Sequence, residues 1–361
     1  PTKPLIFVIC ACIVMLYTHV APIRTSSMRL FNFLSKQPEL KEHNNPDDYT
    51  LVHDILWASP NEFDLTIDIY TPATGKDAYP VVIMFHGGGW LMNNKSIMDQ
   101  SAAYFATNSD YVICNVNYRL LSDNNNSTTM DAIVNDAFGA VLWVKEHITA
   151  YRGDPARVAV TGDSAGGHLA AMIVNSGRQL STEPFSAESL NFTPSYIPES
   201  QSLEEIRLRD GLAVQAAILS YPFEFYQAAL DGFEKKFNPI WWLRGAIGRG
   251  FFGDEFNVED DPAIYMALSA LKTIPNVTKR QLPPQLLTVG SNDPIVSPAS
   301  VRTYMKALEA AGQPAQYWEY HDKSHAFLDS GSNRLLRTGF ALDAPPALNV
   351  MIRFLDDIFY P

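Results

Sequence analysis

A serine flanked by glycines is the residue of this chain best placed for covalent chemistry. The pattern G-x-S-x-G occupies residues 162–166, after the apolar run 157–162 and before a segment with helical spacing. A sharp turn from a strand into a helix strains the backbone of the serine and lifts its hydroxyl clear of the sheet, and flanking glycines leave room for that turn. The helix N-terminus also favours developing negative charge. We therefore predict that Ser164 is the nucleophile of an acyl-transfer reaction.

Three consecutive glycines in MFHGGGW (84–90) directly follow another apolar run. Consecutive glycines lower stability, because glycine loses more conformational freedom on folding than other residues. They are useful where main-chain N–H groups have to face a ligand. In serine hydrolases such a loop supplies donors to the oxyanion, and each donor stabilises the transition state by roughly 3 kcal/mol. We predict that Gly88, Gly89 and Ala165 form an oxyanion hole and that His86 braces the loop.

An aspartate and a histidine near the C-terminal end complete the expected set. Asp293 lies in TVGSNDPIVSP, after the apolar run 285–290, and His325 lies in YHDKSHAFLD, after 315–321. Loops that follow the strands of an open α/β sheet carry its ligand-facing residues. We predict that His325 takes the proton of Ser164 and that Asp293 orients the imidazole.

Other acids and histidines leave alternatives for these two roles. Asp322 and Asp329 lie on the loop of His325 itself, and we expect both to face solvent. His321, at the end of a strand, is the rival to His325 as the base.

The elements expected to position these residues alternate between strands and helices. The first two strands alternate in polarity and are expected to form an antiparallel pair. Alternation with short crossovers then predicts an α/β protein with a mostly parallel sheet covered by helices. The expected strands are 51–58, 64–71, 81–85, 111–118, 157–162, 213–221, 285–290 and 315–321, and the expected helices are 96–108, 128–150, one from about 164, 298–312 and about 347–359.

Composition limits the class of protein further. The chain has 361 residues, of which 47% are hydrophobic, and a formal net charge of −12. We predict one main domain over residues 28–361, because α/β folds of this length often form a single unit. The acidic balance argues against a nucleic-acid partner, which needs a basic surface. The three cysteines show no metal-ligand spacing, and the predicted serine chemistry needs no metal and no cofactor.

The N-terminal segment carries its own signal. Residues 5–17 are the unbroken apolar run LIFVICACIVMLY. This length fits the apolar region of a signal peptide or a short membrane anchor. We predict a signal peptide or anchor over residues 1–27, with residues 5–21 as the possible anchor, and a membrane-anchored, secreted or periplasmic protein. Burial of the segment on the protein itself is the third reading.

Two segments are candidates for a cap over the site, residues 28–50 and 223–282. The second is rich in aromatic residues and longer than the connecting loops of a compact domain. We expect it to cover the substrate. Its residues Trp241, Trp242, Phe251 and Phe252 could line an acyl or alcohol pocket, but a role in the core of the cap is favoured.

The motifs together resemble a known family. HGGGW, GDSAGG, the aspartate in SNDPI, the histidine in SHAF and NYRL at 117–120 are similar to the hormone-sensitive-lipase-like and acetyl-esterase branch of the α/β hydrolases. The resemblance runs from about Val81 to the C-terminus. The chain departs from that pattern where LSDNNN follows NYRL, and DPIVSP resembles carbohydrate-acyl esterases and small peptidase-like relatives.

The resemblance implies an α/β-hydrolase fold and a serine esterase. We predict cleavage of small carboxylic esters with short to medium acyl chains through an acyl-enzyme. An amidase, formamidase or polysaccharide deacetylase on the same residues is the alternative, and a ligand-binding member without activity is the third reading. The sequence leaves the oligomeric state undetermined.

Overall fold

The chain folds around one eight-stranded sheet, here described from a computed structural model that covers residues 48–234 and 249–361. The sheet has the order β1-β2-β4-β3-β5-β6-β7-β8. Its strands are β1 (Tyr49–Ala58), β2 (Leu65–Pro72), β3 (Tyr79–Phe85), β4 (Val112–Val116), β5 (Gly153–Asp163), β6 (Ala216–Ser220), β7 (Gln285–Gly290) and β8 (Ala315–Tyr320). Strand β2 is antiparallel to both neighbours, and every pair from β4 to β8 is parallel. The predicted sheet and its antiparallel opening pair are confirmed.

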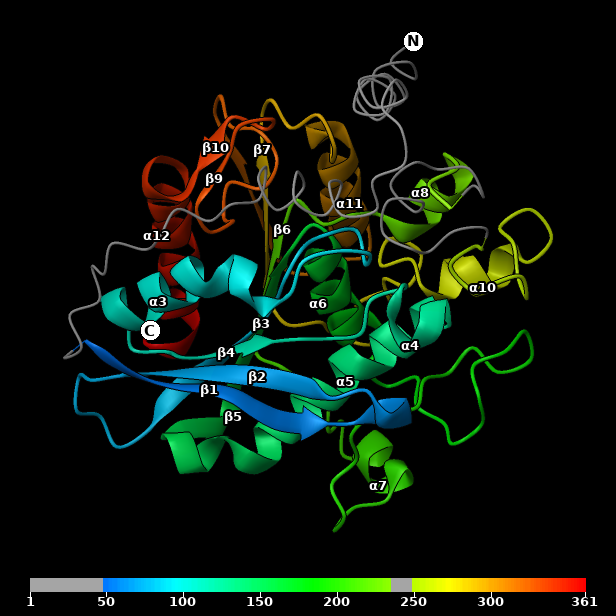
Figure 1. Cartoon of the computed structure of the whole chain (residues 1–361), viewed down its shortest axis with the longest axis horizontal. Helices are drawn as coiled ribbons and strands as arrows, with labels where there is room; N and C mark the ends of the chain where they lie inside the picture. The colour runs from blue at the N-terminus through cyan, green and yellow to red at the C-terminus, as the bar shows by residue number, and fades with distance from the viewer. Residues whose placement is uncertain (1–47, 235–248) are drawn as a thin grey trace, which may run out of the picture.

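Helices cover both faces of this sheet (Figure 1). Helix α3 packs beside α12 on one face, and α5 packs beside α6 on the other. The helices are α3 (Asp99–Asn108), α4 (Asp123–Asn126), α5 (Met130–His147), α6 (Ala165–Ser176), α7 (Leu203–Leu208), α8 (Phe225–Leu230), α10 (Pro262–Ala267), α11 (Pro298–Ala310) and α12 (Phe340–Phe359). Short 3₁₀ helices lie at η1 (Pro60–Glu62), η2 (Lys95–Met98) and η3 (Ile148–Tyr151), and a small hairpin joins β9 (Ser332–Asn333) to β10 (Thr338–Gly339).

The central strands are buried on both faces. Every residue of β3, β4, β6 and β7 is buried, as the continuous apolar runs of a parallel sheet between helices require. Strand β1 lies at one edge, and most of its side chains are exposed or half-buried. It also carries a bulge, because Val52 pairs with Ile69 while Ile55 pairs with Ile67. Asp54, inside this bulge, has a positive φ of 52°.

The last helix starts earlier than the sequence predicted. Helix α12 begins at Phe340 and contains Pro345 and Pro346, whereas the prediction placed its start near 347 because proline removes a helical donor. The carbonyls left without donors belong to Ala341 and Leu342, which are exposed, so water can reach them. The carboxylate of Asp343 in the first turn accepts the main-chain N–H of Gly339 at 2.7 Å.

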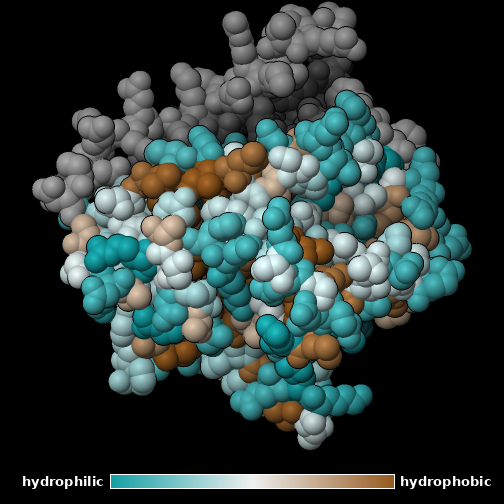
Figure 2. All heavy atoms as spheres, turned by 90° about the horizontal axis from the view of Figure 1, so that it is seen from below, coloured by the Kyte–Doolittle hydropathy of each residue, from teal (hydrophilic) through white to brown (hydrophobic). Residues whose placement is uncertain are grey.

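One face of the molecule is mainly hydrophilic (Figure 2). On the face shown in Figure 2 the apolar side chains form separate patches among charged and polar ones, as expected for a chain with a net charge of −12. No helix in the described ranges is long and apolar enough to cross a membrane. The predicted signal peptide or anchor (1–27, with 5–21 as the anchor) lies outside the described residues, as does most of the N-terminal cap segment 28–50.

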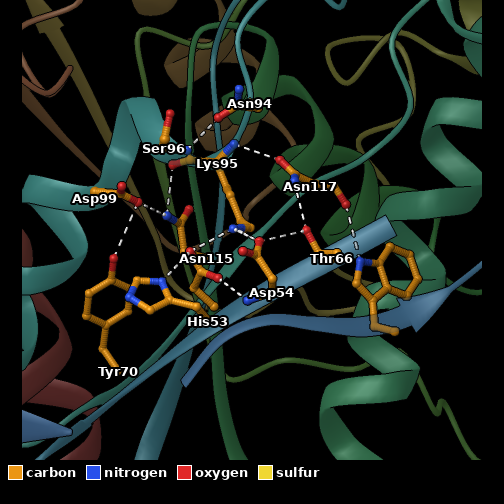
Figure 3. Close-up of polar contacts among 12 residues, drawn as sticks. His53, Asp54, Thr66, Tyr70, Asn94, Lys95, Ser96, Asp99, Asn115 and Asn117 are labelled. Atoms are coloured by element: carbon orange, nitrogen blue, oxygen red, sulfur yellow. Dashed lines mark hydrogen bonds and ion pairs between the residues drawn. The ribbon is translucent and has the colours of Figure 1, made fainter. Parts of the chain in front are cut away.

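A polar network is enclosed between the first strands and the start of α3 (Figure 3). Lys95 Nζ donates to Asp54 Oδ1 at 2.7 Å and to Asp68 Oδ2 at 2.8 Å. Beside it, Asp99 Oδ1 accepts from Tyr70 Oη at 3.3 Å and from Asn115 Nδ2 at 3.2 Å. The ammonium of Lys95 therefore lies near three carboxylates, in a site that is partly shielded from solvent.

The ionised form of Asp99 is destabilised in this arrangement. Burial, with a further contribution from the charge of Asp68, raises the pKa of Asp99 from 3.8 to about 6, against the opposing charge of Lys95. The folded protein thus holds a proton on Asp99 at pH values where the unfolded chain has already lost it. The free energy of unfolding consequently falls as the pH rises from about 4 to about 6.

Asp99→Asn is expected to remove this cost. The amide oxygen can still accept from Tyr70 and Asn115, while the ionisable group is gone. We expect the variant to be more stable than the wild type at pH 8, by on the order of 1–2 kcal/mol, and the difference to shrink toward pH 4. Urea unfolding at pH 8 and pH 5 measures this, with Asp77→Asn at an exposed position as the control. A difference that stays constant with pH would contradict the assignment.

Candidate active site

The predicted nucleophile lies on a strained turn between β5 and α6. Strand β5 ends at Asp163, helix α6 begins at Ala165, and Ser164 between them has φ 52° and ψ −115°. Such a backbone conformation costs on the order of 1–3 kcal/mol and persists only where its surroundings enforce it. Here Ser164 N donates to Ser220 O at 2.9 Å, and Ser164 O accepts from the N–H groups of His168 at 3.1 Å and Phe223 at 3.0 Å.

The glycines of the motif allow the close approach that this turn needs. A Cβ atom at Gly162 would lie 2.3 Å from the carbonyl carbon of Gly166. A Cβ atom at Gly166 would lie 2.0 Å from the main-chain oxygen of Phe85, at the end of β3. Larger residues would therefore push the helix away from the sheet, which is the steric reason predicted for the pattern.

The structure brings the three predicted side chains together. His325 Nε2 lies 3.1 Å from Ser164 Oγ, and His325 Nδ1 lies 2.7 Å from Asp293 Oδ2. The second oxygen of Asp293 accepts the N–H groups of Ile295 and Val296, each at 2.8 Å. The three residues are only 5–6% exposed. The contact joins positions separated by 161 and 32 residues of sequence.

Two neighbouring strands hold the acid and the base. Asp293 follows β7 and His325 follows β8, and these strands are parallel neighbours, so their carboxyl ends meet at one edge of the sheet. The loops are also bonded to each other, because Asn292 N donates to Lys323 O at 2.9 Å. The loops that carry the two side chains are thus held together by a main-chain hydrogen bond.

The glycine loop after β3 lies against the turn that carries the serine. Gly88 O accepts from the N–H groups of Leu91 at 3.1 Å and Met92 at 3.1 Å, which closes the loop into a compact turn. Gly88 has φ 128°, and a Cβ atom there would lie 2.1 Å from Met92 O, so only glycine fits. Among the described residues, the N–H groups of Gly88, Gly89 and Ala165 donate to no hydrogen bond. These are the donors predicted for the oxyanion.

His86 braces this loop. Its Nδ1 lies 2.8 Å from Gly87 O, its main-chain oxygen accepts from Tyr118 Oη at 2.7 Å, and its ring stacks on that of Tyr118 with centroids 4.3 Å apart. Burial lowers the pKa of His86 to about 4, so the ring is neutral at physiological pH. The arrangement agrees with the predicted structural role.

The rival residues lie in different surroundings. His321 has a side chain that is 90% exposed and pairs with the exposed Asp322 at 3.0 Å. Asp329, expected to face solvent, is half-buried, and burial, with a contribution from the charge of Asp163, raises the pKa of its carboxyl well above the usual range. The residues just before it, Ala326, Phe327 and Leu328, are buried.

Asp163 and Tyr221 are two neighbours of the site that the sequence did not indicate. Burial raises the pKa of Asp163 to about 6, and the charge of His325 acts against that shift. The ring of Tyr221 lies 4.7 Å from that of His325, between centroids. Asp163 fills the variable position of G-x-S-x-G, and Tyr221 lies at the end of an expected strand outside any motif. The sequence therefore does not indicate a role for either residue.

Aromatic residues of the 223–282 segment pack together behind the loop. The ring of Trp90 lies 5.5–5.8 Å between centroids from those of Phe223, Phe225 and Phe251. Phe251 and Phe252 are buried in this cluster, which agrees with the packing role favoured for them. Trp241 and Trp242 lie outside the described residues. Across the described ranges, no group of three or more His, Cys, Asp or Glu side chains is arranged to hold a metal ion.

Comparisons with known protein families and solved structures give further evidence on the fold. Residues 67–197 match the BD-FAE family, and residues 251–341 match the prolyl oligopeptidase family. Among solved structures, the apo form of Thermogutta terrifontis esterase 2 superposes with a TM-score of 0.61 at 23% identity, covering 89% of this chain and 98% of that one. The sheet order and the structural match show that the chain has the α/β-hydrolase fold.

Within that class, curated relatives are esterases. The chain is 31% identical to carboxylesterase NlhH of Mycobacterium tuberculosis over 151 residues, which are 42% of this chain and 44% of that protein. It is 27% identical to isoprenylcysteine alpha-carbonyl methylesterase ICME of Arabidopsis thaliana over 262 residues, 73% of this chain and 54% of that protein. The chain thus spans about half the length of these relatives.

Proposed function

We propose that this chain hydrolyses carboxylic esters with Ser164 as the nucleophile, His325 as the base and Asp293 as its orienting acid. The observation that carries the proposal is the continuous contact from Asp293 Oδ2 through His325 to Ser164 Oγ, at 2.7 and 3.1 Å. It ends at a serine with a strained backbone, and such strain clusters at functional sites. The esterase names of the sequence relatives support the same reaction class.

The first half of the reaction forms an acyl-enzyme. Ser164 Oγ attacks the ester carbonyl carbon while its proton moves to His325 Nε2. Asp293 accepts the N–H of His325 Nδ1 and so presents Nε2 as the acceptor. The N–H groups of Gly88, Gly89 and Ala165 stabilise the oxyanion. The tetrahedral intermediate collapses, the proton on His325 passes to the leaving alcohol, and Ser164 carries the acyl group.

The second half releases the acid. A water molecule gives its proton to His325 Nε2 as its oxygen attacks the acyl carbon, and the same donors hold the second oxyanion. The bond to Ser164 Oγ then breaks, and the proton returns from His325 to that oxygen. The free enzyme and a carboxylic acid are the products.

We further propose that the acyl group is short to medium in length. Phe233 approaches the glycine loop, with its Cζ atom 3.4 Å from where a Cβ atom at Gly89 would be. An aromatic wall so close to the oxyanion donors limits the room beside the carbonyl. The fold neighbour Thermogutta terrifontis esterase 2 has been solved with propionate and with butyrate bound, which supports short chains.

Amide hydrolysis is the second candidate. The match of residues 251–341, which contain Asp293 and His325, to the prolyl oligopeptidase family favours it. The acylation chemistry is the same, but His325 would have to protonate an amine instead of an alcohol.

Hydrolysis of p-nitrophenyl esters tests the proposal. Full-length protein is given the acetate, butyrate, octanoate and laurate esters, and p-nitroacetanilide is the amide counterpart. We expect kcat/KM to be highest at acetate or butyrate and the anilide to remain uncleaved. Labelling of Ser164 by a fluorophosphonate with no ester turnover would shift the assignment to an amide or a specialised acyl substrate. A folded protein with neither labelling nor turnover would favour a ligand-binding role.

A further inference from the structure

The glycine loop is anchored mainly by one segment, residues 115–121, which contains the NYRL motif. At the start of the loop, Tyr118 Oη donates to His86 O at 2.7 Å. In its middle, Leu121 N donates to Trp90 O at 2.8 Å. At its end, both main-chain groups of Lys95 are held by side chains of this segment. The proposed function above gives these residues no role, although they fix the loop of residues 86–95 along its whole length.

Lys95 is the residue of this loop that the segment holds through both of its main-chain groups (Figure 3). Lys95 N donates to Asn117 Oδ1 at 2.7 Å, and Lys95 O accepts from Asn115 Nδ2 at 2.8 Å. Both asparagines come from the carboxyl end of β4 and the residue just after it. Asn117 is fixed in turn, because its Nδ2 donates to Thr66 Oγ1 at 3.1 Å. The backbone of Lys95 is thus tied to two strands of the sheet.

The side chain of Lys95 adds a charged anchor to the first hairpin. It is only 10% exposed, and its ammonium lies between Asp54 of β1 and Asp68 of β2. Burial acts to lower the pKa of Lys95, but the hydrogen bonds and charges of the two aspartates outweigh it and raise the pKa, so the ammonium stays charged. Only Asp68 of the two partners is buried, since the Asp54 side chain is 71% exposed. Moving the ammonium away would therefore leave the Asp68 carboxylate buried without its charged partner.

A few hydrogen bonds within the loop connect the residues before Lys95 with the proposed oxyanion donors. Asn93 Nδ2 donates to Gly87 O at 3.3 Å, and the N–H groups of Leu91 and Met92 close on Gly88 O. Hydrogen bonds thus join the residues from Gly87 to Asn93, and Lys95 follows two residues later. We expect a shift of Lys95 to displace the N–H groups of Gly88 and Gly89.

We propose that Lys95 is a positioning residue for the oxyanion hole, held by Asn115, Asn117, Asp54 and Asp68. This inference rests on the proposed function, because it assigns the loop to the oxyanion. Donors stabilise the oxyanion only when they are aimed at its position in the transition state, and a displacement of about 1 Å far from the chemistry can lower a rate about 100-fold. Lys95 touches neither substrate nor reacting atoms in this arrangement. Its effect passes through the loop.

Lys95→Met tests the proposal by separating transition-state stabilisation from substrate binding. The methionine keeps the length of the side chain but cannot bridge Asp54 and Asp68. We expect kcat on p-nitrophenyl butyrate to fall about 10- to 100-fold while KM changes by less than about threefold. Affinity for a trifluoromethyl ketone, which forms an oxyanion on Ser164, is expected to fall by the same factor as kcat/KM.

Lys145→Met is the matched control. The ammonium of Lys145 is also enclosed, but it donates to the carbonyls of Gly211 and Ala213, away from the loop. We expect this variant to lose thermal stability while keeping kcat and the affinity for the ketone. Asn117→Ala removes only the acceptor for Lys95 N and its bond to Thr66, keeps both ion pairs, and supplies the same kinetic readout if Lys95→Met does not fold.

The outcomes separate this inference from the proposed function. Unchanged kcat and ketone affinity in Lys95→Met and Asn117→Ala would overturn the positioning role, as would an equal loss in Lys145→Met. A wild type that cleaves no ester would overturn the proposed function alone. In that case the rate of Ser164 labelling by a fluorophosphonate measures the same donors, since charge develops on the phosphoryl oxygen, and an unchanged rate in Lys95→Met would reject the inference.

Discussion

Replacing Ser164 by alanine is expected to lower kcat for p-nitrophenyl butyrate by about 10⁶-fold. The variant removes the only atom that forms the acyl-enzyme, and His325 Nε2 loses its partner at 3.1 Å. The remaining oxyanion donors keep a small rate above that of water. Folding should be unaffected, because the strained turn is held by main-chain bonds to Ser220, His168 and Phe223 that alanine preserves.

Three measurements on this variant are decisive together. Stopped-flow hydrolysis gives the rate, mass spectrometry after fluorophosphonate treatment shows whether any residue is labelled, and circular dichroism shows that the protein is folded. Turnover near the wild-type rate, or labelling at another serine with activity retained, would remove Ser164 from the mechanism.

Replacing Asp293 by asparagine is expected to slow turnover by about 10⁴-fold. The reason lies in how the carboxylate is held. Asp293 Oδ1 accepts two N–H groups, from Ile295 and Val296, so the amide oxygen of an asparagine will take that place. The amide nitrogen then faces His325 Nδ1, where Asp293 Oδ2 now lies at 2.7 Å. A donor there forces Nδ1 to accept, which places the proton on Nε2 and leaves it unable to take the proton of Ser164.

Two isosteric variants serve as controls for the acid. Asp322→Asn changes an exposed residue and is expected to leave kcat within about twofold of the wild type. Asp329→Asn removes a carboxyl that burial already favours in its neutral form, so a modest effect is expected. A loss of several orders of magnitude in either control, with Asp293→Asn active, would show that the acid has been assigned to the wrong residue.

The residues of the proposed triad could be predicted because each follows a strand that the sequence indicates. The runs that became β5 and β7 are apolar, β8 alternates aromatic and polar residues, and parallel strands of one sheet bring the loops that follow them to the same edge. Ser164, Asp293 and His325 could therefore be chosen by position as well as by residue type. The glycine loop after β3 was recognisable by the same argument.

The supporting charges could not be predicted in this way. Asp54, Asp68 and Lys95 are separated by 14 to 41 residues and carry the most common surface charges, so nothing in the sequence distinguishes them from solvated side chains. The burial of Asp68 and Lys95, and the contact of Lys95 with the exposed Asp54, depend on how β1 and β2 fold over the start of α3. Asp329 was misjudged for a related reason, since the direction of a loop depends on tertiary packing. The start of helix α12 could not be predicted from the sequence either, because solvent can satisfy the carbonyls that the prolines leave without donors.

The bulge in β1 also bears on how readily this edge of the sheet could pair with a strand of another molecule. An exposed edge strand offers unpaired N–H and C=O groups to any passing strand, and natural sheets resist such pairing with bulges and charged side chains. Here the extra residue between Val52 and Ile55 breaks the ladder halfway along the edge, and His53 and Asp54 place polar groups at the break. A neighbouring chain could dock on at most a few residues of β1 before its register failed. The hairpin that contacts Lys95 thus also carries the bulge and polar groups that oppose pairing at a sheet edge.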